Sequence, residues 1–171
     1  MIMLDLCCGL KGASEAMRLR GWTVITLDIA QEFEPDIIAD VQQWSWNGKR
    51  PDLIWASPPC QEFNRESMPW SHKGITPNLS IVNACRRIVA ECEPSFWIIE
   101  NVRGAVPYLG EPRAIIAPFY LWGFFPILSL PKLTYHHKES YSSSAKALRA
   151  KIPYQLSLAL AKAVEYSREL L

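Results

Sequence analysis

The feature that most constrains the fold is the alternation of short apolar segments with longer segments of helical periodicity. The expected strands cover residues 1–7, 23–27, 37–39, 53–56 and 96–99, and the expected helices cover 13–20, 81–92 and 154–170. This order is typical of βαβ units, in which helices cross between parallel strands. We therefore expect an α/β fold with a mostly parallel sheet and helices on both of its faces.

The helix expected over residues 81–92 has the clearest periodicity, with Ser80 as its expected N-cap. The side chains expected to face inward are Ala16, Met17 and Leu19 in the first helix, Ile81, Ala84, Cys85, Ile88 and Cys92 in the second, and Leu156, Leu160, Ala163 and Val164 in the last. Pro153 is expected in the first turn of that last helix. Residues 61–78 and 130–151 are polar and are expected to be loops, and the apolar stretch 114–130 fits no single pattern.

Length and composition narrow the class of protein. The 171 residues are most simply one domain, 1–171, with 49% hydrophobic and 20% charged residues. A net charge of +1 argues against a strongly basic protein that coats nucleic acid. The first residues resemble no signal peptide, and no apolar run is long enough to span a membrane, so we expect a cytoplasmic protein.

Cysteine usage points to reduced thiols. The chain has five cysteines, an odd number, and shows no secretory signal. Because no Cys-x2-Cys pair is present, the spacing predicts no metal site.

The residues best suited to bind a ligand or take part in a reaction lie where the expected strands end. They are the loop after Cys7, Asp28, Asp40, Cys60 and Glu100. The carboxyl ends of parallel strands share one edge of an open α/β sheet, and ligands bind at that edge. We expect a functional site there.

The loop of residues 5–12 carries Gly9 and Gly12 directly after the first strand. Glycines at this place let backbone approach a ligand, although a tight strand-to-helix turn needs them equally. Asp28 ends the second strand, where an acidic side chain accepts hydrogen bonds from a ribose or is simply solvated. Asp40, taken alone, fits a cap for the segment that follows it.

Cys60 follows Pro58 and Pro59, which fix φ and carry no backbone N–H. A thiol acts as a nucleophile when its pKa is lowered or a partner is positioned beside it, and the nearby cations are Arg65, His72 and Lys73. Glu100 ends a neighbouring strand, where desolvation raises the pKa of a carboxyl group and makes it a proton donor. A thiol and an acid together suit conjugate addition to an electron-poor ring.

Three segments, residues 5–12, Pro58-Pro59-Cys60-Gln61-x-Phe63 and Glu100-Asn101-Val102, resemble three ordered motifs of the C5-cytosine DNA methyltransferases. The resemblance covers about residues 1–104. It implies a Rossmann-like fold that uses S-adenosylmethionine.

The family's chemistry is implied for the matching positions. Cys60 would attack C6 of cytosine, and Glu100 would protonate N3 or hydrogen-bond to it. C5 would then take the methyl group, and Arg103 would support the ring or Glu100. A base inside a duplex must be extruded before a thiolate reaches it.

The resemblance also implies a cofactor site. Asp5, Cys7 and Gly9 would lie near the methionine end of S-adenosylmethionine, Asp28 would hold the ribose and Asp40 the adenine amino group. The remaining residues assigned to this site are Leu6, Ile29, Val41 and Pro58.

The sequence departs from the family in several places. Cys7 stands where members usually have Phe, Lys11 stands where they have Gly, and no Gln-x-Arg-x-Arg motif follows Gly104. No separate target-recognition domain is expected, which indicates low sequence specificity or recognition by a second copy or a partner subunit. This architecture also suggests a phage or mobile element. Residues 130–151 form a basic stretch that fits phosphate contacts or a solvated loop.

Three functions are therefore weighed. The first is C5-cytosine methylation of DNA, with RNA as a variant substrate. The second is a non-catalytic relative that binds nucleic acid or a partner, which the presence of both Cys60 and Glu100 disfavours. The third is a C5-pyrimidine methyltransferase that acts on free nucleotides.

Overall fold

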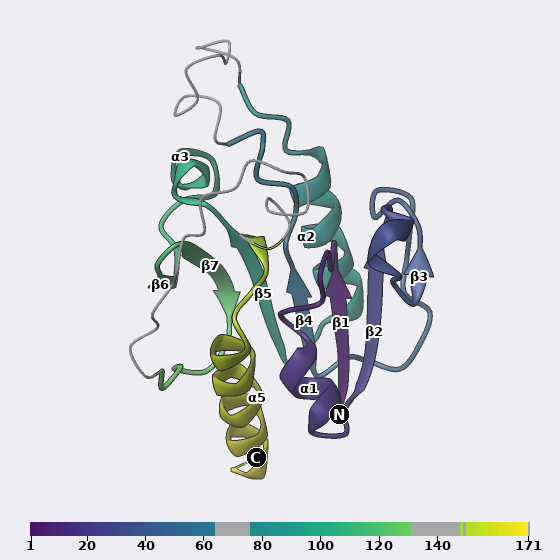
Figure 1. Ribbon diagram of the computed structural model, residues 1–171, viewed down its shortest axis with the longest axis vertical. Coiled ribbons are helices and arrows are strands. Elements are labelled where there is room, and N and C mark those ends of the chain that lie inside the picture. Colours follow the sequence, from purple (N-terminus) through teal and green to yellow (C-terminus); the bar gives the residue numbers. More distant parts are fainter. Residues whose placement is uncertain (64–75, 131–147, 149, 171) are drawn as a thin grey trace.

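The computed structural model describes residues 1–63, 76–130, 148 and 150–170 (Figure 1). These residues form a seven-stranded sheet in the order β3-β2-β1-β4-β5-β7-β6. Its strands are β1 (Ile2–Leu6), β2 (Thr23–Asp28), β3 (Ile37–Ile38), β4 (Leu53–Ala56), β5 (Phe96–Asn101), β6 (Ala114–Ile116) and β7 (Phe119–Phe124). Strands β1 to β5 are parallel, and β7 lies antiparallel between β5 and β6.

Helices cover both faces of the sheet. They are α1 (Glu15–Leu19), α2 (Ser80–Cys92), α3 (Val106–Leu109) and α5 (Tyr154–Glu169), with the 3-10 turns η1 (Gln31–Phe33) and η3 (Arg103–Ala105). Figure 1 shows α1 and α5 on one face and α2 on the other. The expected α/β fold, a mostly parallel sheet with helices on both faces, is confirmed. None of the described helices is long and apolar enough to cross a membrane.

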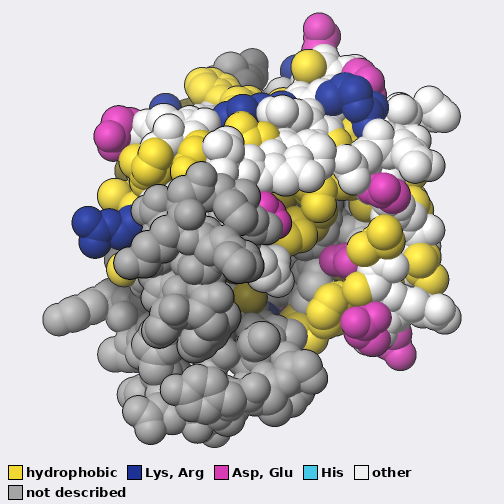
Figure 2. All heavy atoms as spheres, turned by 90° about the horizontal axis from the view of Figure 1, so that it is seen from above, with side chains coloured by type: hydrophobic (Ala, Val, Ile, Leu, Met, Phe, Trp, Pro, Cys, Tyr) yellow, Lys and Arg dark blue, Asp and Glu magenta, His cyan; other side chains and the backbone are white. Residues whose placement is uncertain are grey.

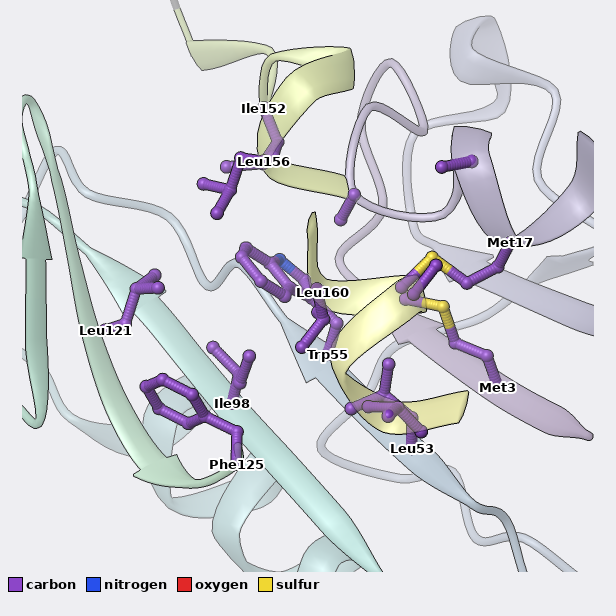
Figure 3. Close-up of a cluster of buried hydrophobic side chains, with 14 of the residues drawn as sticks. Met3, Met17, Leu53, Trp55, Ile98, Leu121, Phe125, Ile152, Leu156 and Leu160 are labelled. Atoms are coloured by element: carbon purple, nitrogen blue, oxygen red, sulfur yellow. The ribbon is translucent and has the colours of Figure 1, made fainter. Parts of the chain in front are cut away.

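Two apolar cores lie on the two faces because successive strand residues point to opposite sides. Trp55 and Ile98 pack against α1 and α5, and Figure 3 shows Trp55 between Ile98 of β5 and Leu160 of α5. Ile54 and Ile99 pack on the other side against α2. The sheet is thus fixed from both sides at the level of β4 and β5.

The last helix, α5, is tied to α1 by buried polar contacts. Ser157 Oγ donates a hydrogen bond to the Ala13 carbonyl (2.6 Å) and accepts one from the Ala16 N–H (3.0 Å). Gly12 lies so close to Ile152 that an added Cβ would be 2.4 Å from the Ile152 oxygen. Gly12 therefore packs closely against the backbone of the segment that leads into α5.

The structure corrects several local expectations. Leu19 is 73% exposed and does not pack inward. Ser80 is the first residue of α2, and Asn78 Oδ1 accepts its N–H (2.9 Å), so Asn78 satisfies the donor that a cap would take. Pro153 is the N-cap of α5 and lies outside its first turn. The stretch left unassigned at 114–130 contains the β6–β7 hairpin.

Candidate active site

Two loops and the end of β5 meet at the carboxyl edge of the parallel strands. Leu6 of β1 pairs with Ala56 of β4, and Ala56 pairs with Ile99 of β5. The loop after β1, the loop after β4 and Glu100 therefore begin at one level of the sheet. Figure 2 looks onto this edge, where hydrophobic and acidic side chains border a hollow in the surface.

The loop after β1 is held to the end of β2. The Gly9 N–H donates to Asp28 Oδ2 (2.9 Å), and the Cys8 N–H donates to the Leu27 carbonyl (3.1 Å). Gly9 has φ +46°, and an added Cβ would meet nothing within 4 Å, so the space beside this glycine is open. The loop thus presents a close-approach surface at Gly9.

The two residues of this loop that depart from the family, Cys7 and Lys11, have an unusual backbone conformation and specific side-chain contacts. Cys7 (φ +55°) and Lys11 (φ +57°) adopt left-handed backbone, which costs a residue with a Cβ about 1–2 kcal/mol. The Cys7 thiol hydrogen-bonds to Cys85 of α2, and this contact together with burial raises the pKa of Cys7. The Lys11 ammonium donates to the Glu34 carbonyl.

Asp5 is the buried carboxyl group below this loop, with 1% of its surface exposed. Its Oδ2 accepts a hydrogen bond from Ser14 Oγ (2.5 Å), and its Oδ1 has no partner among the described residues. The pKa of Asp5 is raised to about 7, chiefly by burial, with a smaller lowering by the Ser14 hydrogen bond and a smaller raising by the nearby Asp28. A buried oxygen without a donor is costly, so this position suits a ligand that brings a cation or an N–H.

Asp28 is the last residue of β2, as expected, whereas Asp40 lies two residues beyond the end of β3. Asp28 is nearly buried, and its Oδ1 accepts the Ala30 N–H (3.0 Å). Asp40 Oδ1 accepts the Gln42 N–H (2.9 Å), which fits the cap considered for it from the sequence. Arg87 of α2 holds the segment after Asp40 by donating to the Val41 carbonyl (3.2 Å).

The apolar residues assigned to the cofactor site have different surroundings. Leu6 and Val41 belong to the core on the α2 face, Pro58 is buried, and Ile29 is 69% exposed. Ile29 is therefore accessible to a ligand over its side chain. Leu6 and Val41 support the edge from below.

The Cys60 loop is clamped by β5. Asn101, 1% exposed, donates from Nδ2 to the Pro58 carbonyl (2.9 Å) and accepts the Val102 N–H at Oδ1 (2.9 Å). The Phe63 N–H donates to the Cys60 carbonyl (3.0 Å) and closes a turn. The Phe63 ring is buried among Val82, Ala105 and Trp122. Both ends of the loop are thus fixed, which positions Cys60 between them.

Gly104 allows this loop to pass close to η3. A Cβ at Gly104 would lie 2.0 Å from the Phe63 carbonyl oxygen, so only glycine fits. The positioning roles of Asn101 and Gly104 were not expected from the sequence. Their signal is their closeness to Glu100 in the sequence, since Asn101 directly follows it on β5 and Gly104 lies four residues after it in η3.

Glu100 and Cys60 interact electrostatically. The pKa of Glu100 is raised to about 7, because burial raises it by more than a hydrogen bond with Ser57 lowers it. Burial raises the pKa of the Cys60 thiol, and the adjacent Glu100 raises it further. The site therefore contains a carboxyl group that titrates near neutral pH beside a thiol that is protonated in the free protein.

Arg103 begins η3 and is exposed. The cations expected to assist Cys60, which are Arg65, His72 and Lys73, lie outside the described residues, as does most of the basic stretch 130–151. Lys151, at the end of that stretch, forms an ion pair with Glu15 (2.9 Å). Within the described ranges, no group of three or more His, Cys, Asp or Glu side chains is arranged to hold a metal ion.

The chain is similar in sequence to a known viral protein. The chain is 31% identical over 117 residues to a Frog virus 3 protein named "Probable DNA (cytosine-5)-methyltransferase". The match covers 59% of this chain and 53% of that protein, so the chain spans about half the length of this curated relative.

Two solved structures are similar to parts of the chain. One is a protein described as a DNA modification methyltransferase encoded within an E. coli prophage, with 23% identity, a TM-score of 0.47, and coverage of 61% of this chain and 33% of that chain. The other is the S. pombe Dnmt2 methyltransferase, with 18% identity, a TM-score of 0.44, and coverage of 63% and 38%.

The family model described as C-5 cytosine-specific DNA methylase matches residues 1–108. That range contains β1 to β5, the loop after β1, Cys60 and Glu100. The chain therefore belongs to the C-5 cytosine-specific DNA methylase family.

Proposed function

We propose that this protein transfers a methyl group from S-adenosylmethionine to C5 of cytosine in DNA through a covalent adduct at Cys60. The observation that carries the proposal is the pairing of Cys60 with Glu100 at the carboxyl edge of the sheet. The family match supports the same reaction.

Cys60 and Glu100 have complementary roles in this proposal. The Cys60 sulfur bonds to C6 of the ring as its proton leaves to solvent, and Glu100 donates its proton to N3. Electron density then gathers at C5, which takes the methyl group. The methyl group's bond to the cofactor sulfur would break, leaving S-adenosylhomocysteine, and the C5 proton would leave to solvent. Breakage of the sulfur–C6 bond, return of a solvent proton to the Cys60 sulfur and return of the N3 proton to Glu100 then restore the starting state of the protein.

The raised pKa of Glu100, about 7, suits this role. A general acid works best when its pKa lies near the operating pH, because a large fraction of it is then protonated and the proton is still transferred readily. Asn101 supports the pair by holding the Pro58 carbonyl, which keeps the cysteine loop beside β5.

The residues of the first loop fit S-adenosylmethionine, which supplies an electrophilic methyl group when bound. The unpartnered Asp5 oxygen would accept its ammonium group, and the open space beside Gly9 would accommodate its chain. Asp28 would accept the ribose hydroxyls and Asp40 the adenine amino group, with Ile29 and Val41 beside the adenine. Cys7 and Leu6 would flank the methionine end, and Pro58 the transferred methyl group.

Arg103 and target choice belong to the same proposal. Arg103 is exposed one residue beyond Val102 and would contact the target ring or a phosphate. We propose low sequence specificity for the 1–171 domain, with any further recognition supplied by a second copy or a partner subunit. Sequencing of the methylated cytosines in treated DNA tests this directly.

The test is methyl transfer from labelled S-adenosylmethionine to duplex DNA, RNA or dCMP. Cys92→Ala is a matched control for Cys60→Ala, because Cys92 is also partly buried and burial and a nearby glutamate raise its pKa too. We expect 5-methylcytosine in DNA with the wild type and Cys92→Ala, and none with Cys60→Ala.

Each other outcome is informative. Methylation that survives Cys60→Ala would contradict the covalent mechanism. Methyl transfer only to RNA or only to dCMP would show that this molecule, and not DNA, is the substrate. Cofactor binding without transfer to any of the three would favour a non-catalytic binding protein.

A further inference from the structure

Two hydrogen bonds of Ser57, one with Trp55 and one with Glu100, assign a role to a residue that the proposed reaction does not use. We propose that Ser57 is a positioning residue, oriented by the Trp55 indole, whose hydroxyl donates to one carboxyl oxygen of Glu100 and leaves the acid proton on the other oxygen. This inference rests on the proposed function and specifies how its acid is held.

The direction of the hydrogen bonds follows from the donor inventory. Trp55 Nε1 donates to Ser57 Oγ (2.7 Å), and an indole N–H is only a donor. Ser57 Oγ therefore uses a lone pair toward Trp55 and keeps its single proton for another acceptor. Glu100 is the hydrogen-bond partner that remains. Because one carboxyl oxygen of Glu100 accepts the hydrogen bond from the Ser57 hydroxyl, the acid proton is carried by the other oxygen.

The position of the indole is fixed by the core. Trp55 is fully buried on the α1–α5 face, and Figure 3 shows its ring packed beside Leu160 with its nitrogen directed away from the β5 residue Ile98. Ser57 lies two residues further along the chain, and Glu100 lies two residues beyond Ile98, the partner of Trp55 in the sheet. Trp55, Ser57 and Glu100 thus share one face, so the packing of α5 reaches the acid through two hydrogen bonds.

Few charged groups compete for Glu100 in the described part of the chain. The residue opposite it on β7 is Leu121, which is uncharged, and the residue that contacts it just after β4 is Ser57. The Cys60 thiol faces it from the cysteine loop, but its raised pKa keeps it neutral near pH 7. Loss of the Ser57 hydroxyl should therefore be visible in the titration of Glu100.

The experiment follows Glu100 directly. The wild-type chain is labelled with carboxyl-¹³C glutamate, the Glu100 signal is assigned by its loss in Glu100→Gln, and its chemical shift is recorded against pH. A hydrogen bond from a hydroxyl favours the carboxylate, so Ser57→Ala should move the midpoint upward by about one pH unit. The acid limb of the kcat/KM profile should move with it.

Three further variants separate positioning from general damage. Ser57→Thr keeps a hydroxyl and should restore the wild-type midpoint. Trp55→Phe frees the Ser57 hydroxyl to rotate and should give a smaller upward movement. Trp22→Phe removes a comparable indole-to-Glu165 hydrogen bond (3.0 Å) at the other end of α5 and should leave the midpoint unchanged.

An unchanged midpoint in Ser57→Ala would overturn the proposal. A downward movement would also overturn it, because Ser57 would then be accepting the acid proton. If Ser57→Ala does not fold, a wild-type midpoint in Trp55→Phe overturns it equally. If the expected midpoints appear but wild-type protein transfers no methyl group, the positioning role stands and the proposed function fails.

Discussion

Replacing Gly104 with alanine tests whether the cysteine loop must stay where η3 holds it. The added Cβ would lie 2.0 Å from the Phe63 oxygen, whereas ordinary contact begins near 3.4 Å, so the two segments must separate by about 1.4 Å. Phe63 is joined to Cys60 by the turn hydrogen bond. The displacement therefore reaches the thiol.

A misplacement of about 1 Å in a catalytic group costs roughly 100-fold in rate. We therefore expect kcat/KM for methyl transfer to DNA to fall about 100-fold in Gly104→Ala, and overpacking to lower the free energy of unfolding by about 1–3 kcal/mol. Radiolabel transfer at saturating cofactor measures the first, and urea unfolding measures the second.

Gly21→Ala is the matched control. Gly21 has φ +79° at the end of α1, and an added Cβ there meets nothing within 4 Å. The free energy of unfolding of this variant should fall by about 1 kcal/mol because of backbone strain, and its activity should be unchanged. Activity of Gly104→Ala within about threefold of wild type, which is only about 0.7 kcal/mol, would show that η3 does not hold Cys60 in place. An equal loss of activity in Gly21→Ala would show the same.

Two further predictions concern Asp5 and α5. Because a bound cation favours the ionised carboxyl, protonation of Asp5 should compete with S-adenosylmethionine, so affinity should fall up to about tenfold per pH unit below pH 7. In Asp5→Asn, the affinity for S-adenosylmethionine measured by calorimetric titration should not change with pH across this range. An affinity that falls as steeply with pH as in the wild type would contradict the role of Asp5. Ser157→Ala should lower the free energy of unfolding by about 2 kcal/mol, because it strands the Ala13 carbonyl and the Ala16 N–H. Ser167→Ala on the same helix should cost less than about 0.5 kcal/mol in the same denaturation assay, and equal losses would contradict the assignment.

Local sequence was sufficient to predict the parallel strands. Apolar runs such as Leu53–Ala56 and their placement between helical segments determine where β4 and its neighbours lie. Since parallel strands share one carboxyl edge, the meeting of Cys60 and Glu100 followed from the order of the motifs.

Long-range contacts could not be predicted in this way. Gly12 is constrained by Ile152, and the Pro58 carbonyl is held by Asn101, in each case by a residue far along the chain. The β6–β7 hairpin was missed because the apolar stretch that contains it, residues 114–130, matches neither a helical nor a strand period. The Trp55–Ser57 bond was missed because nothing in the sequence shows which hydroxyl a buried indole meets.

The proposed mechanism requires that Cys60 form a bond to C6 of the cytosine that is methylated. In DNA with 5-fluorocytosine at the target position, fluorine replaces the C5 hydrogen and cannot leave as a cation, so the adduct should persist. Intact-mass measurement with S-adenosylmethionine should show wild-type and Cys92→Ala protein carrying one oligonucleotide and one methyl group. Peptide mapping should place the oligonucleotide on Cys60, and Cys60→Ala should carry none. A wild-type protein that methylates ordinary cytosine but forms no such adduct, or forms it at another residue, would contradict the account.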